Sequence, residues 1–299
     1  MQRVVVTGGA GFIGSNLVDK LIEQGKEVLI IDNLSTGKKE NINPNAKFLQ
    51  LDLDAYTSSV IAEEIKGYDV VFHMAALPQV QQSIENPTNN NNINSTINIL
   101  EASRKANIKR VIFSSTSALY GNPVYTPIDE SHPINPLSPY ALHKLVGENY
   151  CKLYSEIYDL DTVCLRYFNV YGNRMSNEGA YRSVISIFQE SFLNKIPFNI
   201  VNDGEQKRDF VHVNDIIEAN ILCALNNKLF NGSIFNVGTG KAYTVNEIAD
   251  MFGGEKQYGE TRIEPKDSVA DNSAILKLGW KPKGVLFSWI KNFKKTFTS

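Results

Sequence analysis

Short apolar runs, rich in β-branched residues, alternate with longer amphipathic stretches along the first half of the chain. The apolar runs predict buried strands at residues 3–7, 28–32, 48–52, 68–73, 110–114 and 162–166. The stretches with apolar residues at helical spacing predict helices at residues 12–24, 94–106 and 140–157. Strands that alternate with helices are typical of an α/β fold with a parallel, doubly wound sheet and right-handed crossovers.

The alternation becomes less regular after residue 168, where the elements shorten and Gly, Asn and Pro turns increase. This change predicts a smaller C-terminal lobe that the chain enters and leaves more than once. We expect residues 1–168, with parts of 209–238, to form the larger domain. Residues 169–208 and 239–299 are expected to form the substrate-binding lobe.

The composition narrows the function classes. A chain of 299 residues fits one large α/β domain with a smaller lobe, and its net charge of -2 does not favour nucleic acid or a membrane surface as partners. No apolar run approaches the roughly 20 residues that span a bilayer, and no signal-peptide pattern is present, so we expect the cytoplasm. The three cysteines form no C-x-x-C pair and the four histidines lack ligand spacing, so no metal is expected.

A glycine cluster follows the first predicted strand and opens the first predicted helix. Residues 8–14 fit the spacing G-x-x-G-x-x-G, in which glycines allow a tight turn and let the backbone approach a pyrophosphate. The free N–H groups of the helix N-terminus would face those phosphates. The alternative, a plain glycine turn, does not explain why strand and helix flank the cluster so closely. The sequence therefore predicts a Rossmann dinucleotide site.

Two aspartates end the next two predicted strands. Asp32 stands near the roughly 20-residue offset at which an acid binds the adenosine ribose diol, which favours NAD over NADP, although Lys38 and Lys39 keep NADP open. Asp52 could hold the adenine amino group or simply cap its strand end. The asparagine run at residues 89–92 is expected to cap the helix that begins near residue 94.

Tyr140 and Lys144 form a Y-x-x-x-K pair on one face of a predicted helix. A phenol is a weak base near neutral pH, but a nearby ammonium and a positive nicotinamide ring would lower its pKa. Such a phenolate could take a proton from a substrate hydroxyl while hydride leaves the same carbon. The alternative is an exposed tyrosine and a solvated lysine. The hydroxyl cluster at residues 114–117, which ends a predicted strand, favours the catalytic interpretation, and Thr116 could bond the same substrate oxygen.

Together these motifs resemble those of the extended short-chain dehydrogenase/reductase family, in its nucleotide-sugar epimerase/dehydratase group. The segments that carry the resemblance span nearly the whole chain. They are residues 7–15, Asp32–Gly37, His73–Ala76, Ser114–Thr116, the Tyr140/Lys144 pair, Arg166–Gly172 and Arg208–Val213.

The resemblance implies a set of site residues. The expected NAD contacts are Gly8, Gly11, Phe12, Ile13, Gly14, Asp32, Asn33, Ser35, Thr36, Gly37, Asp52, Leu53, Met74, Ala75, Ala76, Asn92, Ser114, Tyr140, Lys144 and Phe168. The expected substrate contacts are Thr116, Ser117, Tyr140, Asn169, Ala180, Val184, Arg208, Arg262 and Ser268, with Thr116, Tyr140 and Lys144 catalytic. Guanidinium groups suit a diphosphate, although each arginine could instead form a surface ion pair.

The residues after Thr116 bear on the reaction. In the family's 4,6-dehydratases this threonine precedes Asp-Glu, and in its UDP-glucuronate decarboxylases a glutamate stands where Ala118 is; here Ser117 and Ala118 carry no carboxyl group. The resemblance then implies C4 epimerisation of a UDP-hexose through a 4-keto sugar, with NAD regenerated in each cycle. A UDP-glucuronate or dTDP-sugar epimerase, a net NAD(P)-dependent reductase and a non-catalytic NAD-binding protein remain alternatives.

Two segments resemble epimerases that accept N-acetylhexosamines, at residues 179–185 and 266–271. In the family a bulky tyrosine near the second segment restricts the sugar pocket, and Ser268 replaces it here, unless Ser268 points to solvent. UDP-glucose, UDP-galactose, UDP-GlcNAc and UDP-GalNAc are therefore the expected substrates. The helices that begin near Asn94 and Tyr140 resemble those of the family's four-helix dimer interface, which implies a homodimer.

Overall fold

The computed structural model describes residues 1–78, 80–88, 92–175, 183–259 and 267–298 of the chain. The strands are β1 (Arg3–Thr7), β2 (Glu27–Asp32), β3 (Lys47–Gln50), β4 (Val70–His73), β5 (Arg110–Thr116), β6 (Asp161–Tyr167), β7 (Asn169–Tyr171), β8 (Phe198–Ile200), β9 (Lys207–His212), β10 (Ser233–Val237), β11 (Ala242–Thr244), β12 (Lys256–Tyr258) and β13 (Asp267–Ser268). The helices are α1 (Phe12–Glu23), α2 (Ser58–Glu64), α3 (Val80–Glu85), α4 (Ile93–Lys105), α5 (Pro139–Tyr158), α6 (Val184–Asn194), α7 (Val213–Leu225), α8 (Val245–Phe252), α9 (Ser273–Leu276) and α10 (Leu286–Thr298). Short 3-10 helices are η1 (Lys39–Asn41) and η2 (Ser117–Tyr120).

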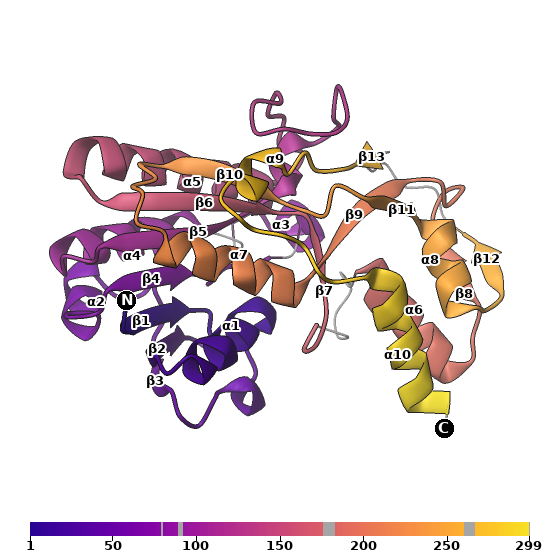
Figure 1. Cartoon of the computed structure of the whole chain (residues 1–299), viewed down its shortest axis with the longest axis horizontal. Coiled ribbons are helices and arrows are strands. Elements are labelled where there is room, and N and C mark those ends of the chain that lie inside the picture. The colour runs from indigo at the N-terminus through magenta and orange to yellow at the C-terminus, as the bar shows by residue number, and fades with distance from the viewer. Residues whose placement is uncertain (79, 89–91, 176–182, 260–266, 299) are drawn as a thin grey trace.

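A parallel sheet of seven strands organises the larger part of the molecule (Figure 1). Its order is β10-β6-β5-β4-β1-β2-β3, so the chain runs outward from β1 in one direction, returns to β4 and then runs outward in the other. The switch lies between β1 and β4, which is where ligands bind in folds of this kind. The predicted α/β fold with a doubly wound parallel sheet is thus confirmed.

Alternating residues of the same strands face two separate hydrophobic cores, because successive side chains point to opposite faces of a sheet. In β1, Val4 and Val6 pack with α1 and α7, whereas Val5 packs with α2, α4 and α5. Both faces of the sheet are therefore covered by helices. This explains why the strands read as continuous apolar runs in the sequence.

A third hydrophobic core joins α6, α8 and α10 to the short strand β8. Aromatic rings dominate it, and Phe188, Phe198 and Phe252 lie in mutual ring contact. Figure 1 shows these elements to the right of the large sheet, with the C-terminus at the end of α10. Before α7 and β10 the chain passes through this smaller part, and it returns there for α8, so the two parts are interleaved along the sequence.

Several boundaries differ from the predictions for local reasons. The strand expected at 68–73 begins at Val70, because the Asp69 side chain accepts the backbone N–H groups of Gln2 and Arg3. The predicted cap of α4 is wrong at Asn92, whose side chain makes no capping bond. Its Oδ1 instead accepts the backbone N–H of Leu77 at 2.7 Å, across 15 positions of the chain. Residues 89–91 of the asparagine run lie outside the described residues.

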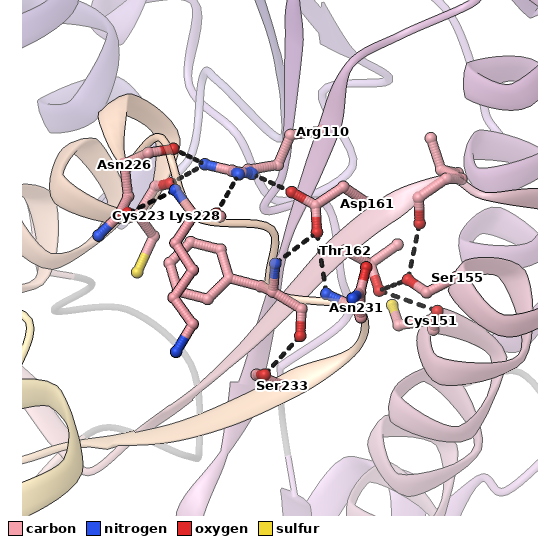
Figure 2. Close-up of polar contacts among 12 residues, drawn as sticks. Arg110, Cys151, Ser155, Asp161, Thr162, Cys223, Asn226, Lys228, Asn231 and Ser233 are labelled. Atoms are coloured by element: carbon pink, nitrogen blue, oxygen red, sulfur yellow. Dashed lines mark hydrogen bonds and ion pairs between the residues drawn. The ribbon is translucent and has the colours of Figure 1, made fainter.

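A buried ion pair connects the sheet to the end of α7 at the edge away from the strand C-termini (Figure 2). Arg110 opens β5 and Asp161 opens β6, and their side chains meet at 2.5 Å. Arg110 also donates to the backbone oxygens of Cys223, Asn226 and Lys228 at 2.6 to 2.7 Å. The other oxygen of Asp161 accepts the N–H groups at residues 230 and 231. The pair therefore orders the segment that leads from α7 into the edge strand β10.

Candidate active site

Two cavities lie side by side at the C-terminal ends of the sheet strands. The first has a volume of about 510 Å³ and the second about 670 Å³. Pro78, Tyr140 and Tyr167 line both of them, so these residues mark the junction. Two adjoining chambers of this kind fit a cofactor and a substrate that react with each other where the chambers meet.

The first cavity gathers most of the residues predicted to contact NAD. Those that line it are Gly8, Gly11, Phe12, Ile13, Gly14, Asp32, Asn33, Ser35, Thr36, Asp52, Leu53, Met74, Ala75, Ala76, Asn92, Ser114, Tyr140 and Lys144. Gly37 does not line this cavity but packs against Asp32. A Cβ at Gly37 would lie only 2.9 Å from the Asp32 carboxylate. Phe168 lines the second cavity instead of the first. The role of each of these residues toward NAD stays a prediction.

The glycine turn between β1 and α1 fits a dinucleotide phosphate because it leaves no room for side chains. A Cβ on Gly14 would overlap the backbone oxygen of Gly8. Gly8 has a φ of +67°, and a Cβ there would lie 2.7 Å from the backbone nitrogen of Ala75. Contacts this short force a shift of backbone, so side chains at Gly8 and Gly14 would close the turn. The compact turn thus lets a phosphate approach the backbone at the N-terminus of α1, where Phe12 and Ile13 line the first cavity.

Asp32 is oriented by the backbone around it. Its carboxylate is only 7% exposed and accepts the N–H groups of Ala10 at 2.9 Å and Leu34 at 2.8 Å. These bonds fix the side chain at the end of β2, where it lines the first cavity beside Asn33. A fixed carboxylate at this position suits the two hydroxyls of an adenosine ribose.

A buried histidine joins three sides of the first cavity through hydrogen bonds of defined direction. The Thr96 hydroxyl donates to the backbone oxygen of Asn92 at 2.9 Å, so the Nε2–H of His73 donates to Thr96 at 3.2 Å. The Nδ1 of His73 then accepts from the Thr7 hydroxyl at 2.8 Å, and Thr7 accepts the N–H of Ala75 at 3.2 Å. Burial, with a smaller effect from the charge of Lys144, lowers the pKa of His73 to about 3. The ring is therefore neutral and serves as a connector.

Tyr140 lies at the junction of the cavities with its phenol buried. Burial raises the pKa of Tyr140 to about 12, and a hydrogen bond with Thr116 opposes the rise. Thr116 lines the second cavity at the end of β5. The sequence-based expectation of a lowered pKa is not met by the protein groups, because burial outweighs the single hydrogen bond. The positive charge that would lower this pKa has to come from what occupies the first cavity.

The Lys144 side chain is directed to β5 and does not contribute to lowering the pKa of Tyr140 in the structure. Its Nζ donates to the backbone oxygen of Ser114 at 2.7 Å and lies 4.8 Å from the centre of the Phe113 ring. Burial lowers the pKa of Lys144 to about 8. Lys144 thus lines the first cavity one helical turn after Tyr140, and the end of β5 holds its ammonium.

The second cavity gathers the predicted substrate residues that the structure describes. Those lining it are Thr116, Ser117, Tyr140, Asn169, Val184, Arg208 and Ser268. Asn169 is held by a bond from its Nδ2 to the backbone oxygen of Asp209 at 2.9 Å. Ser268 stands beside Arg208 in the pairing of β13 with β9. Ala180 and Arg262 lie outside the described residues.

A buried polar network supports the wall shared by α5 and β5. Glu148 and Arg166 form a two-bond ion pair at 2.7 and 2.8 Å, with Arg166 only 1% exposed. Ser115, next to Thr116, donates to Glu148 at 2.5 Å. Arg166 also donates to the Tyr120 hydroxyl at 2.8 Å, which in turn donates to Asn236. The network ties the helix that carries Tyr140 to the strand that carries Thr116.

Sequence reasoning missed several lining residues. Tyr167 lines both cavities but is absent from the predicted site residues, although it lies in the Arg166–Gly172 segment. Val80, Gln81 and Ile84 of α3 line the second cavity, and α3 was not predicted at all. A helix of six residues carries too little periodicity to be found in the sequence.

Comparison with known proteins gives the family. Residues 4–238 match the model of the NAD dependent epimerase/dehydratase family.

The chain belongs to the NAD dependent epimerase/dehydratase family.

Relatives within this family cover nearly the whole length of the chain. A protein of Methanocaldococcus jannaschii, named provisionally as a UDP-glucose 4-epimerase, is 46% identical over 98% of this chain and 100% of its own. The UDP-N-acetylglucosamine 4-epimerase of Methanobrevibacter ruminantium M1, solved with UDP-N-acetylmuramic acid, is 40% identical with a TM-score of 0.92, covering 99% of this chain and 98% of that one. The UDP-glucose 4-epimerase of Thermus thermophilus, solved with NAD, is 34% identical with a TM-score of 0.89, covering 99% of both. NAD is the cofactor of this family, and the first cavity fits it.

Other ligand classes find less support in the described part of the chain. No group of three or more His, Cys, Asp or Glu side chains there could hold a metal ion. Among the described residues, no helix is long and apolar enough to span a membrane. Cys151, Cys164 and Cys223 are buried free thiols.

Proposed function

We propose that this member of the family is a UDP-hexose 4-epimerase in which Tyr140 exchanges a proton with the sugar 4-hydroxyl. The proposal rests on the position of Tyr140 between the two cavities. Its side chain lines both the cavity that fits NAD and the cavity that gathers the predicted sugar contacts. A group that removes a proton while hydride leaves the same carbon has to stand at such a junction.

Thr116 contributes to the environment of the Tyr140 phenol, and Lys144 lines the cavity that fits NAD. The Thr116 hydroxyl bonds the phenol and lowers its pKa, which opposes the effect of burial. NAD in the first cavity would supply the hydride acceptor and donor for C4, and the positive ring of its oxidised form would favour the phenolate. Lys144 lines the same cavity, where the backbone oxygen of Ser114 holds its ammonium at 2.7 Å. In the proposed reaction Tyr140 takes the proton from the 4-hydroxyl. It returns the proton after the 4-keto sugar has rotated to present its opposite face.

The described lining of the second cavity contains no acid next to Thr116 that could divert the 4-keto sugar toward elimination. Ser117 and Ala118 line it and carry no carboxylate, whereas elimination of water across C5 and C6 needs an acid and a base there. Asp267 also lines the cavity, but it stands beside Ser268 in β13, which pairs with β9. Return of the hydride to the opposite face is then the remaining outcome, which is epimerisation.

The residues of the second cavity fit a UDP-sugar. Arg208 can form two parallel hydrogen bonds to diphosphate oxygens, and Asn169 offers an oriented amide. Ser268 lines the cavity, and its small side chain leaves space for a 2-acetamido group. We therefore include UDP-GlcNAc and UDP-GalNAc with UDP-glucose and UDP-galactose as substrates. Both named solved relatives act on one of these sugars by their names.

A homodimer through α4 and α5 forms part of the proposal. Leu142, Leu153 and Ile157 of α5 are 50%, 41% and 59% exposed. Their spacing along the sequence places them on one face of the helix. A stripe of exposed aliphatic side chains on a 20-residue helix is costly in water and suits a symmetric partner.

We propose the cytoplasm as the site of action. We also propose that residues 1–168 with parts of 209–238 bind NAD, while residues 169–208 and 239–299 bind the sugar nucleotide.

Proton NMR of the purified chain without added NAD tests the reaction directly. UDP-glucose and UDP-GlcNAc are supplied separately, and the expected result is the appearance of the galacto anomeric signal in both samples. Turnover of UDP-glucose alone would contradict the role given to Ser268. Product from neither sugar would contradict the proposed substrates and direct the test to UDP-glucuronate and dTDP-sugars.

Tyr140→Phe is the matched control for the proton transfer. The variant keeps the ring and removes only the hydroxyl, so we expect it to retain NAD and to lose epimerisation. A fully active Tyr140→Phe variant would show that another group acts as the base. Steady consumption of added NADH by the wild-type chain would instead indicate a net reductase.

A further inference from the structure

Helix α3 carries one buried side chain, and it is polar. Ser83 is 0% exposed, whereas the other five residues of the helix are exposed. Val80, Gln81 and Ile84 line the second cavity instead of packing into a core. The serine is therefore the inward attachment of a helix that otherwise faces the substrate cavity.

The hydroxyl of Ser83 has both of its bonding directions fixed. It donates to the backbone oxygen of Val80 at 2.5 Å within its own helix. Its oxygen then accepts the backbone N–H of Tyr140 at 3.1 Å, 57 positions along the chain. The contact therefore joins α3 to the residue proposed as the acid and base.

This bond supplies the partner of one amide in the first turn of α5. The first amides of a helix have no partner within the helix. Pro139 has no N–H, and the Ser138 side chain and backbone oxygens accept the N–H groups of Ala141 and Leu142. The remaining amide of the first turn, that of Tyr140, is the one whose partner comes from another element. The site residue itself is thus held by α3.

Resting on the proposed function, we propose that Ser83 is a positioning residue for Tyr140 and couples it to the helix that lines the sugar cavity. Ser83 lines neither cavity, so it acts through Tyr140 and is not a catalytic residue. Its bond keeps the Tyr140 backbone, and hence the phenol, within reach of Thr116. Movement of α3 as a sugar fills the cavity is transmitted to the same backbone N–H.

Ser83→Ala tests the proposal, with Ser155→Ala as its matched control. Ser155 is a buried serine near the other end of α5, where its hydroxyl donates to the backbone oxygen of Leu160 at 2.6 Å. For Ser83→Ala we expect kcat to fall on the order of 10- to 100-fold, since small displacements of a reacting group have effects of this size, with little change in KM. Ser155→Ala should leave kcat near the wild-type value.

The pH profile separates positioning from a general loss of structure. The hydrogen bond with Thr116 lowers the pKa of Tyr140, so a displaced phenol loses this effect and its pKa rises. The acidic limb of kcat should therefore move to higher pH in Ser83→Ala and stay unchanged in Ser155→Ala. A Ser83→Ala variant that matches Ser155→Ala in both kcat and pH profile would overturn the proposal.

Amide hydrogen exchange in the wild-type chain tests the contact independently of any variant and of activity. The Tyr140 amide should exchange more slowly than its intrinsic rate, and UDP-sugar should slow it further as α3 is held in place. Exchange at the intrinsic rate would overturn the proposal even if Ser83→Ala failed to fold. Absence of any epimerisation in the wild-type chain would contradict the proposed function and leave this exchange result to decide the role of Ser83.

Discussion

Removal of the charge of Arg110 should destabilise the chain without slowing catalysis. In Arg110→Met the Asp161 carboxylate keeps its two backbone donors but loses its cation, and the backbone oxygens of Cys223, Asn226 and Lys228 lose their donor (Figure 2). Breaking one partner of a buried ion pair costs about 3 to 5 kcal/mol. An unfolding entropy of about 2.1 cal/mol/K per residue converts this loss over 299 residues into a fall in Tm of about 5 to 8 °C.

Thermal unfolding followed by circular dichroism at saturating NAD measures this loss, because equal ligand binding keeps the comparison fair. Lys109→Met is the matched control. It removes the neighbouring lysine, whose side chain is 74% exposed in its ion pair with Asp69, and it should cost less than about 1 kcal/mol.

The turnover number is the second readout. Arg110 begins β5 and Thr116 ends it, so at about 3.3 Å per residue the two lie roughly 20 Å apart. We expect kcat of Arg110→Met to equal that of the wild type well below its Tm. A Tm within about 2 °C of the wild type, or a lower kcat under those conditions, would refute this reasoning.

Three further predictions address the cofactor turn, the buried histidine and the dimer. Gly14→Ala places a Cβ against the backbone oxygen of Gly8, so the purified variant should carry no NAD by absorbance; retention of the wild-type NAD content would contradict the turn geometry. His73 is neutral in the fold with a pKa of about 3 against about 6.5 unfolded, so its contribution is complete above about pH 6.5 and is lost as pH falls toward 3. The stability gap between wild type and His73→Gln in urea should thus narrow by about 1.4 kcal/mol per pH unit below 6.5, and a constant gap would contradict the buried neutral ring. Leu153→Arg puts a charge on the exposed stripe of α5 beside Ile157 and should give a monomer in light scattering; an unchanged dimer would place the interface elsewhere.

Local signals were enough to predict the strand–glycine–helix unit and the Tyr140/Lys144 helix. Each rests on a pattern contained within one element and its turn, such as the apolar run of β1 followed by Gly8 and α1. The direction of a side chain was not contained in such a pattern. The sequence placed Lys144 on the face of Tyr140, but its Nζ bonds the oxygen of Ser114, a partner supplied by the neighbouring strand.

Elements that depend on distant partners could not be found from the sequence. Helix α3 is attached through Ser83 to Tyr140, and strand β10 exists because its residues pair with β6 at the edge of the sheet. Asn92 shows the same limit at the level of one residue. Its place in an asparagine run just before α4 suggested a helix cap, whereas in the fold its side chain accepts the backbone N–H of Leu77.

The interleaving of the two parts has a consequence for biosynthesis. Every described residue that lines the cofactor cavity lies at or before Tyr167, whereas the lining of the sugar cavity runs on to Ser268. A ribosome adds about 5 to 20 residues per second. It therefore synthesises Ser268, the last described residue of the sugar cavity, roughly 5 to 20 seconds after Tyr167, the last described residue of the cofactor cavity. The nascent chain therefore has every described residue of its dinucleotide chamber before it has the last residues of its sugar chamber, so the cofactor cavity can be complete in sequence while the sugar cavity still lacks part of its wall.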